Sequence, residues 1–306
     1  MIKIKSVKTV LMAFLLLAVA ACEPYEDYIG DYDFSAVYFG SQKPLRTLVT
    51  RENEAQLEFK LGVVLAGLRE NKTDQWVTFQ VDTTLLDSVD GASGFTLLPE
   101  DWYSFSISEN KIIIPKGKFL GDFTISIDKA KFTADPLSLT KKYALPVRLL
   151  ETSADSILKG DDVIAGRHYT ILVVKYINEY SGTYYVRGKQ EELDINGNVV
   201  AGSLKEYNHV DWSRNKTRVA ITTGLNQYEM TGMGNEASDK MKVNVAAGNV
   251  VTLTSSVLPV TDLGCTYADG VYNFKYQYVK GGKTYKVDES LKQRNDPEND
   301  LRFEEW

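Results

Sequence analysis

Short runs of β-branched and aromatic residues, separated by tight-turn residues, constrain this chain more than any other feature. Segments such as LEFKLGVVLAG, QWVTFQVD, GDFTISID and HYTILVVKYI are rich in valine, isoleucine, threonine and aromatic residues. Several of them alternate polar and apolar residues, which is typical of strands with one packed and one solvated face. No segment carries a long helical stripe, and DTTLLDSVDG is expected to form one short helix. The sequence therefore predicts an all-β protein.

The strand pattern changes near the middle of the chain and predicts two domains. Residues 35–177 contain about seven strands, the number that an immunoglobulin-like β-sandwich uses. Residues 180–306 contain roughly eight shorter strands joined by tight turns, such as the Asn-Gly of DINGNV. Such a meander tends to close into a small up-and-down, lipocalin-like β-barrel, because closure removes the exposed strand edges. A second open sandwich is the alternative for this half.

The N-terminus predicts export and lipidation. Residues 10–21 form an uncharged apolar stretch behind a basic start, shorter than the roughly 20 residues that span a bilayer. This length suits a signal peptide, and small residues precede Cys22 as a lipoprotein peptidase requires. We therefore expect residues 1–21 to be a lipoprotein signal peptide, Cys22 to be lipidated and residues 22–34 to be a tether. An ordinary signal peptide is the alternative.

Charge and cysteine content exclude several classes of protein. The formal net charge is −6, and removal of residues 1–21 takes away three lysines and no acids, which leaves −9. An acidic chain without a basic run has no electrostatic reason to bind nucleic acid. Once Cys22 carries lipid, Cys265 has no partner, so we expect no disulfide framework.

Several segments resemble a known family. DYDFSAVYFGSQKPLRTLV, LPEDWYSF, IIIPKG and YALPVRLLE resemble the N-terminal domain of Bacteroidetes surface lipoproteins, called domain of unknown function 1735. The half from YSGTYYVRG to LRFEEW resembles domain of unknown function 4361. This resemblance implies a polysaccharide-utilisation apparatus, whose outer-membrane transport proteins are candidate partners, and many such proteins are thought to bind glycans. It supplies no catalytic residues.

The acids directly after Cys22 extend this expectation to localisation. In such lipoproteins, acids at this place accompany display on the outer face, and here Glu23, Glu26 and Asp27 follow the cysteine. We therefore expect a lipid anchor in the outer membrane, with the protein facing outside the cell. The inner leaflet is the alternative.

Catalytic and metal-binding motifs are not found in the sequence. The chain has two histidines that are not clustered, and with Cys22 lipidated no second thiol is left for a zinc site. It has no G-x-S-x-G elbow. A glycosidase needs only two carboxylates at a set distance, and no stretch singles out such a pair. We therefore expect a non-catalytic protein without a cofactor or a metal.

The best candidate glycan site lies in EYNHVDWSRNK. A sugar stacks its apolar face on an exposed aromatic ring, and polar side chains around the ring bind its hydroxyl groups. This stretch supplies Tyr207, His209, Asp211, Trp212 and Arg214. In the alternative reading, Trp212 plugs one end of the barrel with Arg214 stacked on it.

A second candidate site is Trp102 and Tyr103 of LPEDWYSF, for which packing in the sandwich core is the alternative.

A row of rings in YNFKYQYV raises a further question. Tyr272, Phe274, Tyr276 and Tyr278 occupy every second position, so they share one face of a strand. The row lines either the barrel interior or an outer surface. We predict a glycan-binding surface lipoprotein, with an adhesion or scaffold protein of the outer membrane as the alternative. A barrel carrying a small ligand is the third hypothesis.

Overall fold

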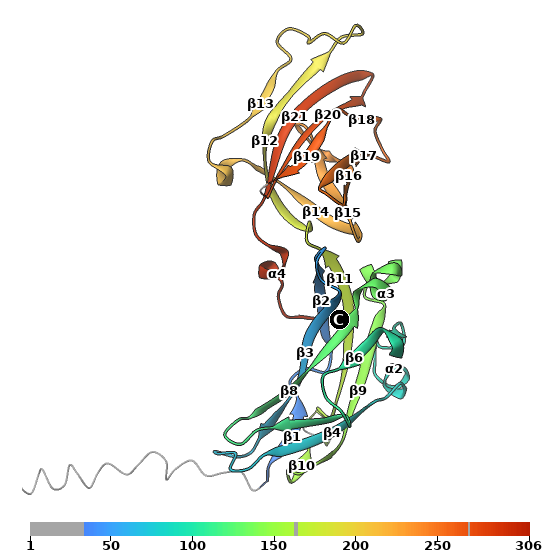
Figure 1. The fold of residues 1–306 in the computed structure, drawn as a ribbon, viewed down its shortest axis with the longest axis vertical. Helices are drawn as coiled ribbons and strands as arrows, with labels where there is room; N and C mark the ends of the chain where they lie inside the picture. The colour runs from blue at the N-terminus through green and yellow to red at the C-terminus, as the bar shows by residue number, and fades with distance from the viewer. Residues whose placement is uncertain (1–33, 162–164, 269) are drawn as a thin grey trace, which may run out of the picture.

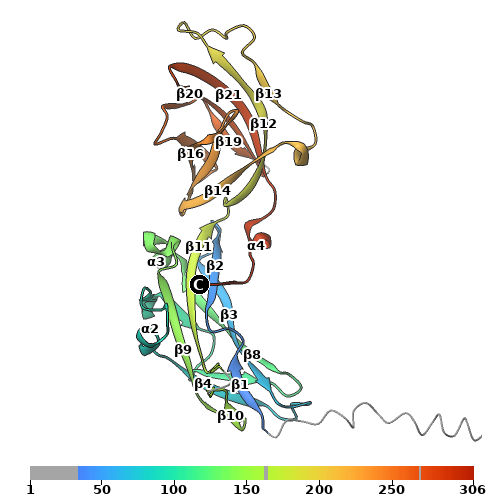
Figure 2. The same cartoon turned by 180° about the vertical axis from the view of Figure 1, so that it is seen from behind.

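The protein is an all-β molecule built from two units (Figures 1 and 2). The computed structural model describes residues 34–161, 165–268 and 270–306. Strands make up 55% of the described residues and helices 9%, which confirms the predicted fold class. The signal peptide, Cys22 and the tether up to residue 33 lie outside the described residues.

The N-terminal unit is a sandwich of two sheets. The five-stranded sheet has the order β10-β1-β3-β8-β6, and the seven-stranded sheet has the order β22-β2-β11-β9-β4-β7, with β5 beside β9. The first sheet comprises β1 (Ala36–Phe39), β3 (Gln56–Ala66), β6 (Tyr103–Phe105), β8 (Leu120–Asp128) and β10 (Ser156–Ile157). The second comprises β2 (Pro44–Thr50), β4 (Gln75–Val81), β5 (Thr96–Leu97), β7 (Lys111–Ile114), β9 (Tyr143–Thr152), β11 (Tyr169–Asn178) and β22 (Glu304–Glu305).

Short helices lie in the connections between the strands of this unit. They are α2 (Thr84–Ser88), η2 (Glu100–Trp102), α3 (Lys129–Ala134) and η3 (Pro136–Leu139). The short helix expected in DTTLLDSVDG is confirmed as α2.

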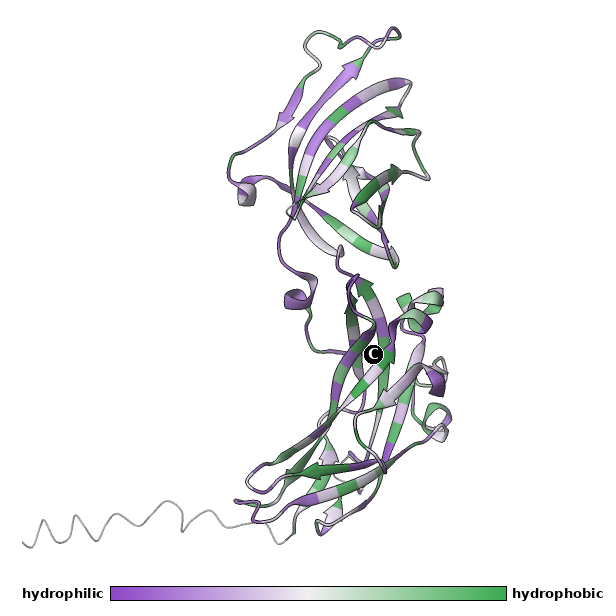
Figure 3. Cartoon of the chain, viewed as in Figure 1, coloured by the Kyte–Doolittle hydropathy of each residue, from purple (hydrophilic) through white to green (hydrophobic). Residues whose placement is uncertain are grey.

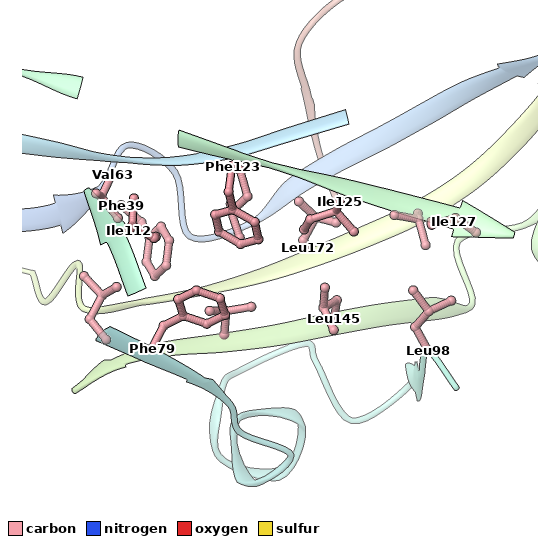
Figure 4. Packing of buried hydrophobic residues seen from close by; sticks show 14 of the residues in the cluster. Phe39, Val63, Phe79, Leu98, Ile112, Phe123, Ile125, Ile127, Leu145 and Leu172 are labelled. Atoms are coloured by element: carbon pink, nitrogen blue, oxygen red, sulfur yellow. The ribbon is translucent and has the colours of Figure 1, made fainter. Parts of the chain in front are cut away.

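The apolar faces of the two sheets form the sandwich core. Phe123, Ile125 and Ile127 alternate along β8 and are buried, as the polar–apolar pattern of GDFTISID predicts. Figure 4 shows these side chains pointing across the sandwich toward Phe79 and Leu145. The rings of Phe79 and Phe123 stack with their centroids 5.0 Å apart. Since each such side chain stabilises the fold by about 1.5–3 kcal/mol when fully buried, this row holds the two sheets together.

The C-terminal unit is an eight-stranded barrel, which confirms the predicted up-and-down barrel rather than a second sandwich. Pairing of the first strand with the last over ten residue pairs closes the sheet. The barrel strands are β12 (Gly182–Leu193), β14 (Lys216–Gly224), β15 (Gln227–Met233), β16 (Glu236–Ala246), β17 (Val250–Thr254), β19 (Cys265–Ala268), β20 (Val271–Lys280) and β21 (Lys283–Gln293). Two short strands, β13 (Lys205–Tyr207) and β18 (Val260–Asp262), flank β12 and β20.

Aromatic rings fill the barrel interior. Tyr272, Phe274, Tyr276 and Tyr278 are each at most 1% exposed, so the alternating row of β20 points inward. Valine, leucine and methionine side chains of the other strands pack against these rings. The interior is therefore a packed core at these positions rather than a lined cavity for a small ligand.

The last residues of the chain return to the N-terminal sandwich. After α4 (Pro297–Asp300), β22 adds antiparallel to the edge of β2. The Nε1 of Trp306 donates to the carbonyl of Ile171 at 2.6 Å, and its ring meets that of Phe95 at 4.8 Å. The sequence pattern assigns residues 180–306 to the C-terminal domain, whereas residues 304–306 lie with the N-terminal sandwich and add a strand to one of its sheets. A two-residue strand has no periodicity that could reveal which sheet edge it joins.

Side chains also connect the two units near both places where the chain passes between them. The Nδ2 of Asn178, at the end of β11, donates to the carbonyls of Gly224 and Gln227 at 3.0 and 2.9 Å. Arg51, beyond the end of β2, pairs with Asp296 at 3.0 Å and with Glu298 at 2.8 Å. The units are thus held together by two chain crossings and by hydrogen bonds between them.

Candidate functional site

The loop between β13 and β14 carries most of the predicted site and is ordered by its own hydrogen bonds. It contains the short helix η4 (Trp212–Arg214), whose start is capped by Asp211 accepting from the Ser213 N–H at 3.0 Å. The Asn215 side chain donates to the carbonyls of His209 and Asp211, both at 2.8 Å. The loop therefore presents Trp212 from a defined backbone, as a short capped turn does.

Trp212 stacks on an arginine of the neighbouring strand. The guanidinium carbon of Arg187 lies 4.0 Å from the centroid of the Trp212 ring, and both side chains are partly buried. This is a cation–π contact, which also holds the planar guanidinium in one orientation. The alternative reading of the sequence gave the stacking role to Arg214, which instead lies exposed.

A polar hollow adjoins this stack on the outer face of the barrel. Its volume is about 530 Å³. Arg187 lines it together with strand residues of β12, β13 and β21. The full lining is Arg187, Gly188, Lys189, Glu206, Asn208, Val210, Asp288, Glu289 and Ser290. The hollow thus offers hydrogen-bond donors and acceptors on strands, beside an indole ring on a loop.

The other predicted residues of the loop are engaged within it. The Asp211 N–H donates to Nδ1 of His209 at 3.0 Å. Hydrogen bonds from Ser213 hold the pKa of Asp211 below its usual value. His209 and Asp211 therefore shape the loop around Trp212, while Arg214 is exposed.

Tyr207 belongs to a buried network and not to the loop surface. Its hydroxyl donates to Glu289 at 2.8 Å, and its ring packs against the barrel core. Arg218 makes two hydrogen bonds with the same carboxylate, at 2.6 and 2.9 Å, and Tyr276 donates to it at 3.0 Å. The side chains of Arg218 and Glu289 are 4% and 0% exposed. The structure thus separates Tyr207 from the other candidates, because its phenol faces inward.

Gly188 makes room for this network. It lies opposite Glu289 on β21, and a Cβ atom at Gly188 would come within 2.5 Å of the Glu289 Cβ. Close approach of β12 to β21 at this point therefore requires glycine.

Burial and charge shift the pKa values of this network. Burial opposes the charge of Arg218, but the adjacent Glu289 carboxylate outweighs it and raises the pKa of the guanidinium. Burial and the same carboxylate raise the pKa of Tyr207. Lys216, 3.6 Å above the Tyr207 ring, has its pKa lowered to about 8 by burial and by the nearby Arg218. The network is a fixed ion pair with neutral phenols around it.

The second candidate pair, Trp102 and Tyr103, lies against the sandwich. The Trp102 ring packs edge-on against Tyr143 at 5.2 Å and is partly buried. Tyr103 packs beside Phe105 at 5.3 Å and lines a hollow of about 560 Å³. The two residues therefore have different surroundings: Trp102 packs against rings of the core, and Tyr103 also lines a hollow.

The sequence analysis missed the strand residues of the polar hollow. Arg187 and Lys189 alternate with the buried Val186 and Gln190 in GTYYVRGKQEEL, which could have placed them on the outer face. Their neighbour Asp288 comes from the far end of the barrel sequence, so only the closing strand pair brings them together.

In the part of the chain that the structure describes, no group of three or more His, Cys, Asp or Glu side chains is arranged to hold a metal ion. Among the same residues, no helix is long and apolar enough to cross a membrane.

Comparisons with known proteins agree with the fold. A family model described as an N-terminal domain matches residues 32–156. A search of curated proteins gave no match. A solved Bacteroides ovatus protein of unknown function is 20% identical, with a TM-score of 0.70, and the alignment covers 87% of this chain and 95% of that chain. At this identity the likeness establishes the two-domain fold alone.

Two further solved structures are more distant. One is a Bacteroides ovatus multidomain protein including domain of unknown function 1735, with 16% identity, a TM-score of 0.40 and coverage of 85% and 94% of the two chains. The other is an auxiliary nutrient-binding protein from Bacteroides thetaiotaomicron, with 13% identity, a TM-score of 0.40 and coverage of 81% and 89%. The resemblance of the second half to domain of unknown function 4361 stays a prediction.

Proposed function

We propose that this protein is a non-catalytic glycan-binding lipoprotein of the cell surface. The observation that carries the proposal is the polar hollow on the outer face of the barrel, next to the Trp212–Arg187 stack. A pyranose ring needs an apolar surface for its C–H face and hydrogen-bond partners for its hydroxyl groups. The indole and the lining of the hollow supply these two needs side by side.

The lining suits hydroxyl groups because it mixes donors and acceptors. Arg187, Lys189 and Asn208 donate hydrogen bonds, whereas Glu206 and Asp288 accept them. All five lie on strands or beside a strand end, so the lining is positioned by the barrel sheet rather than by the loop. Stacking on Trp212 fixes the Arg187 guanidinium before a ligand arrives, which lowers the entropy cost of binding.

Retention on immobilised polysaccharides tests this site. The non-lipidated chain, residues 23–306, is passed over a panel of polysaccharides, and Trp212→Ala and Arg187→Ala are compared with it. Trp76→Ala is the matched control, because Trp76 also carries a cation, the Lys111 ammonium at 4.5 Å, but lies in the sandwich. We expect loss of retention in the first two variants only. Unchanged retention of Trp212→Ala on a polysaccharide that the parent binds would remove this site.

Binding without turnover is the second part of the proposal. It is supported by the sequence, which carries no nucleophile–base motif and no metal-ligand cluster. Incubation of the chain with each bound polysaccharide, followed by a reducing-end assay, checks it. New reducing ends that disappear in Glu206→Gln or Asp288→Asn would make the hollow an active site.

The location at the outer membrane rests on the N-terminal sequence. We propose that Cys22 is lipidated and that the two domains face outside the cell, within reach of outer-membrane transport proteins. Labelling with a radioactive fatty acid should be lost in Cys22→Ala. Protease added to intact cells should remove the wild-type protein, and protection from protease would place it on the inner leaflet.

A further inference from the structure

The outward residues of β12, β21 and β20 form a mainly polar surface that continues from the hollow. Along these strands the inward residues, such as Val186, Glu289 and Phe274, are buried, so the residues between them point outward. Strand register places Arg187 opposite Ser290, and Ser290 opposite Asn273. Figure 3 shows mainly hydrophilic residues along β12 and β13. We call the outward residues of the three strands the barrel track.

The barrel track is positively charged although the protein is acidic. Five cations and two acids lie on it, against a formal charge of −6 for the whole chain. The cations are Arg187, Lys189, Lys275, Lys286 and Lys292, and the acids are Glu191 and Asp288. The cations occupy all three strands, so the charge is spread along the surface and not gathered at one end.

Most of these cations have no acidic partner. Among the described residues, no carboxylate lies within 4.0 Å of the charged nitrogens of Arg187, Lys275, Lys286 or Lys292. Lys189 makes only a 3.8 Å contact with Glu191. Unpaired like charges on one face repel one another, and a bound polyanion relieves that repulsion.

The other side of the barrel is different. On β14, Val219 and Ile221 are 44% and 55% exposed and present aliphatic side chains to solvent. The acid Glu229 on β15 is neutralised by Lys240 on β16 at 2.7 Å. The outward charges of β15 and β16, which are Glu229, Lys240 and Lys242, sum to +1. The barrel track carries +3, or +2 with Glu206 of the adjoining hollow, so the positive charge is greatest on the face that holds the hollow.

We propose that the barrel track binds an anionic polysaccharide, carrying carboxylate or sulfate groups, that also enters the hollow. The inference rests on the proposed function in taking the ligand to be a glycan. Lys286 and Lys292 lie six residues apart on β21, about 20 Å at the 3.4 Å rise of an antiparallel strand. This length accommodates an extended polymer with a charge on successive sugars.

Arg187 joins the two parts of the surface. It lines the hollow, it lies on the barrel track, and its guanidinium lies over the ring of Trp212. A planar guanidinium with free N–H groups matches the two oxygens of a carboxylate or sulfate, which a lysine cannot do. Ser290 and Asn273, hydrogen-bonded to each other at 2.8 Å, add neutral groups for sugar hydroxyls between the charges.

Binding of one polymer with and without its charge tests the inference. Polygalacturonate and its fully methyl-esterified form share a backbone and differ in charge. Chondroitin sulfate tests a sulfated glycan, and a neutral glucan serves as the uncharged reference. Duplex DNA tests a polyanion that is not a glycan. We expect at least one anionic glycan to bind about tenfold or more tightly than the neutral polymers, and to weaken when NaCl rises from 0.05 to 0.5 M, because salt screens exposed charges.

Charge reversal assigns the effect to the barrel track. Lys275→Glu/Lys286→Glu should weaken binding of the anionic glycan about tenfold, since exposed charges act through steering and screened attraction. Lys116→Glu/Lys118→Glu, at two exposed lysines of the sandwich just after β7, changes the net charge equally and should bind like the parent. Circular dichroism verifies that both variants are folded.

The outcomes separate the two proposals. Binding of a neutral polysaccharide that depends on Trp212, with no preference for anionic polymers, overturns the inference and leaves the proposed function intact. Equal losses in both double variants, or equally tight binding of DNA, overturn it as well, since the attraction is then not specific to this face or to glycans. No binding of any polysaccharide overturns both proposals.

Discussion

The buried ion pair of the barrel gives the sharpest test of how the site is held. Glu289 accepts two hydrogen bonds from Arg218 and one each from Tyr276 and Tyr207. The substitution Glu289→Gln keeps the shape but removes the charge, so Arg218 remains buried without a counterion. One of the two oxygen acceptors also becomes an NH₂ group that faces hydrogen-bond donors.

The size of the effect follows from burial. The side chains of Arg218 and Glu289 are 4% and 0% exposed, so water cannot replace the lost partner. Removal of one member of a buried ion pair costs about 3–5 kcal/mol in the free energy of unfolding. Replacing both members, as in Arg218→Met/Glu289→Leu, should cost less than Glu289→Gln, because no buried charge is then left unpaired.

Urea unfolding followed by far-UV circular dichroism at pH 7 measures these changes. Glu58→Gln is the control: Glu58 is an exposed strand residue of the sandwich that accepts a hydrogen bond from Ser126 at 2.9 Å. Its free energy of unfolding should change by less than about 0.5 kcal/mol. A loss below about 1 kcal/mol in Glu289→Gln would refute the reasoning. A free energy of unfolding of Arg218→Met/Glu289→Leu below that of Glu289→Gln would also refute it.

Two further predictions concern pH and the end of the chain. The pKa of Lys216 is lowered to about 8 in the folded state, so between about pH 8 and the unfolded value of 10.5 the unfolded chain binds more protons, and stability rises with pH. The free energy of unfolding of the wild type, relative to that of Lys216→Met, should therefore increase between about pH 7.5 and 9.5. A constant difference between the two proteins over this pH range would contradict the lowered pKa of Lys216. Trp306→Ala should destabilise the sandwich by about 2 kcal/mol in urea unfolding, since it removes a hydrogen bond and ring packing. Phe303→Ala, at a side chain that is 63% exposed, should leave the free energy of unfolding unchanged. An equal loss of stability in both variants would mean that the contacts of Trp306 do not stabilise the sandwich.

The sandwich and the barrel could be predicted because both follow from local patterns. The alternation in GDFTISID places Phe123, Ile125 and Ile127 on one face, and burial of that face needs a second sheet. The tight turns of the second half dictate a meander, and a meander closes to satisfy its edges. The alternation in YNFKYQYV predicts that the row of rings starting at Tyr272 shares one face of a strand. Whether that face points into the barrel or outward depends on where the barrel axis lies.

The candidate site was only partly within reach of the sequence. Trp212, His209 and Asp211 are close in sequence, so their meeting in one loop follows from chain connectivity. Tyr207 lies in the same stretch, yet its phenol turns inward, because a charged partner, Glu289, lies on a strand 82 residues later. Local composition cannot distinguish a ring that faces solvent from one that faces a buried carboxylate.

The sequence by itself determined the class of each unit, the existence of the aromatic loop and the acidity of the chain. These are properties of neighbouring residues, and strand periodicity and turn chemistry act within a few positions. Only the tertiary structure decided that Arg187 lies on Trp212, that the cations of the barrel track lie side by side, and that Trp306 returns to the sandwich. The first depends on the pairing of β12 with β13, which brings the Trp212 loop beside Arg187. The other two depend on pairing between strands that are distant in sequence, which is fixed by closure of the barrel and by the free edge of β2.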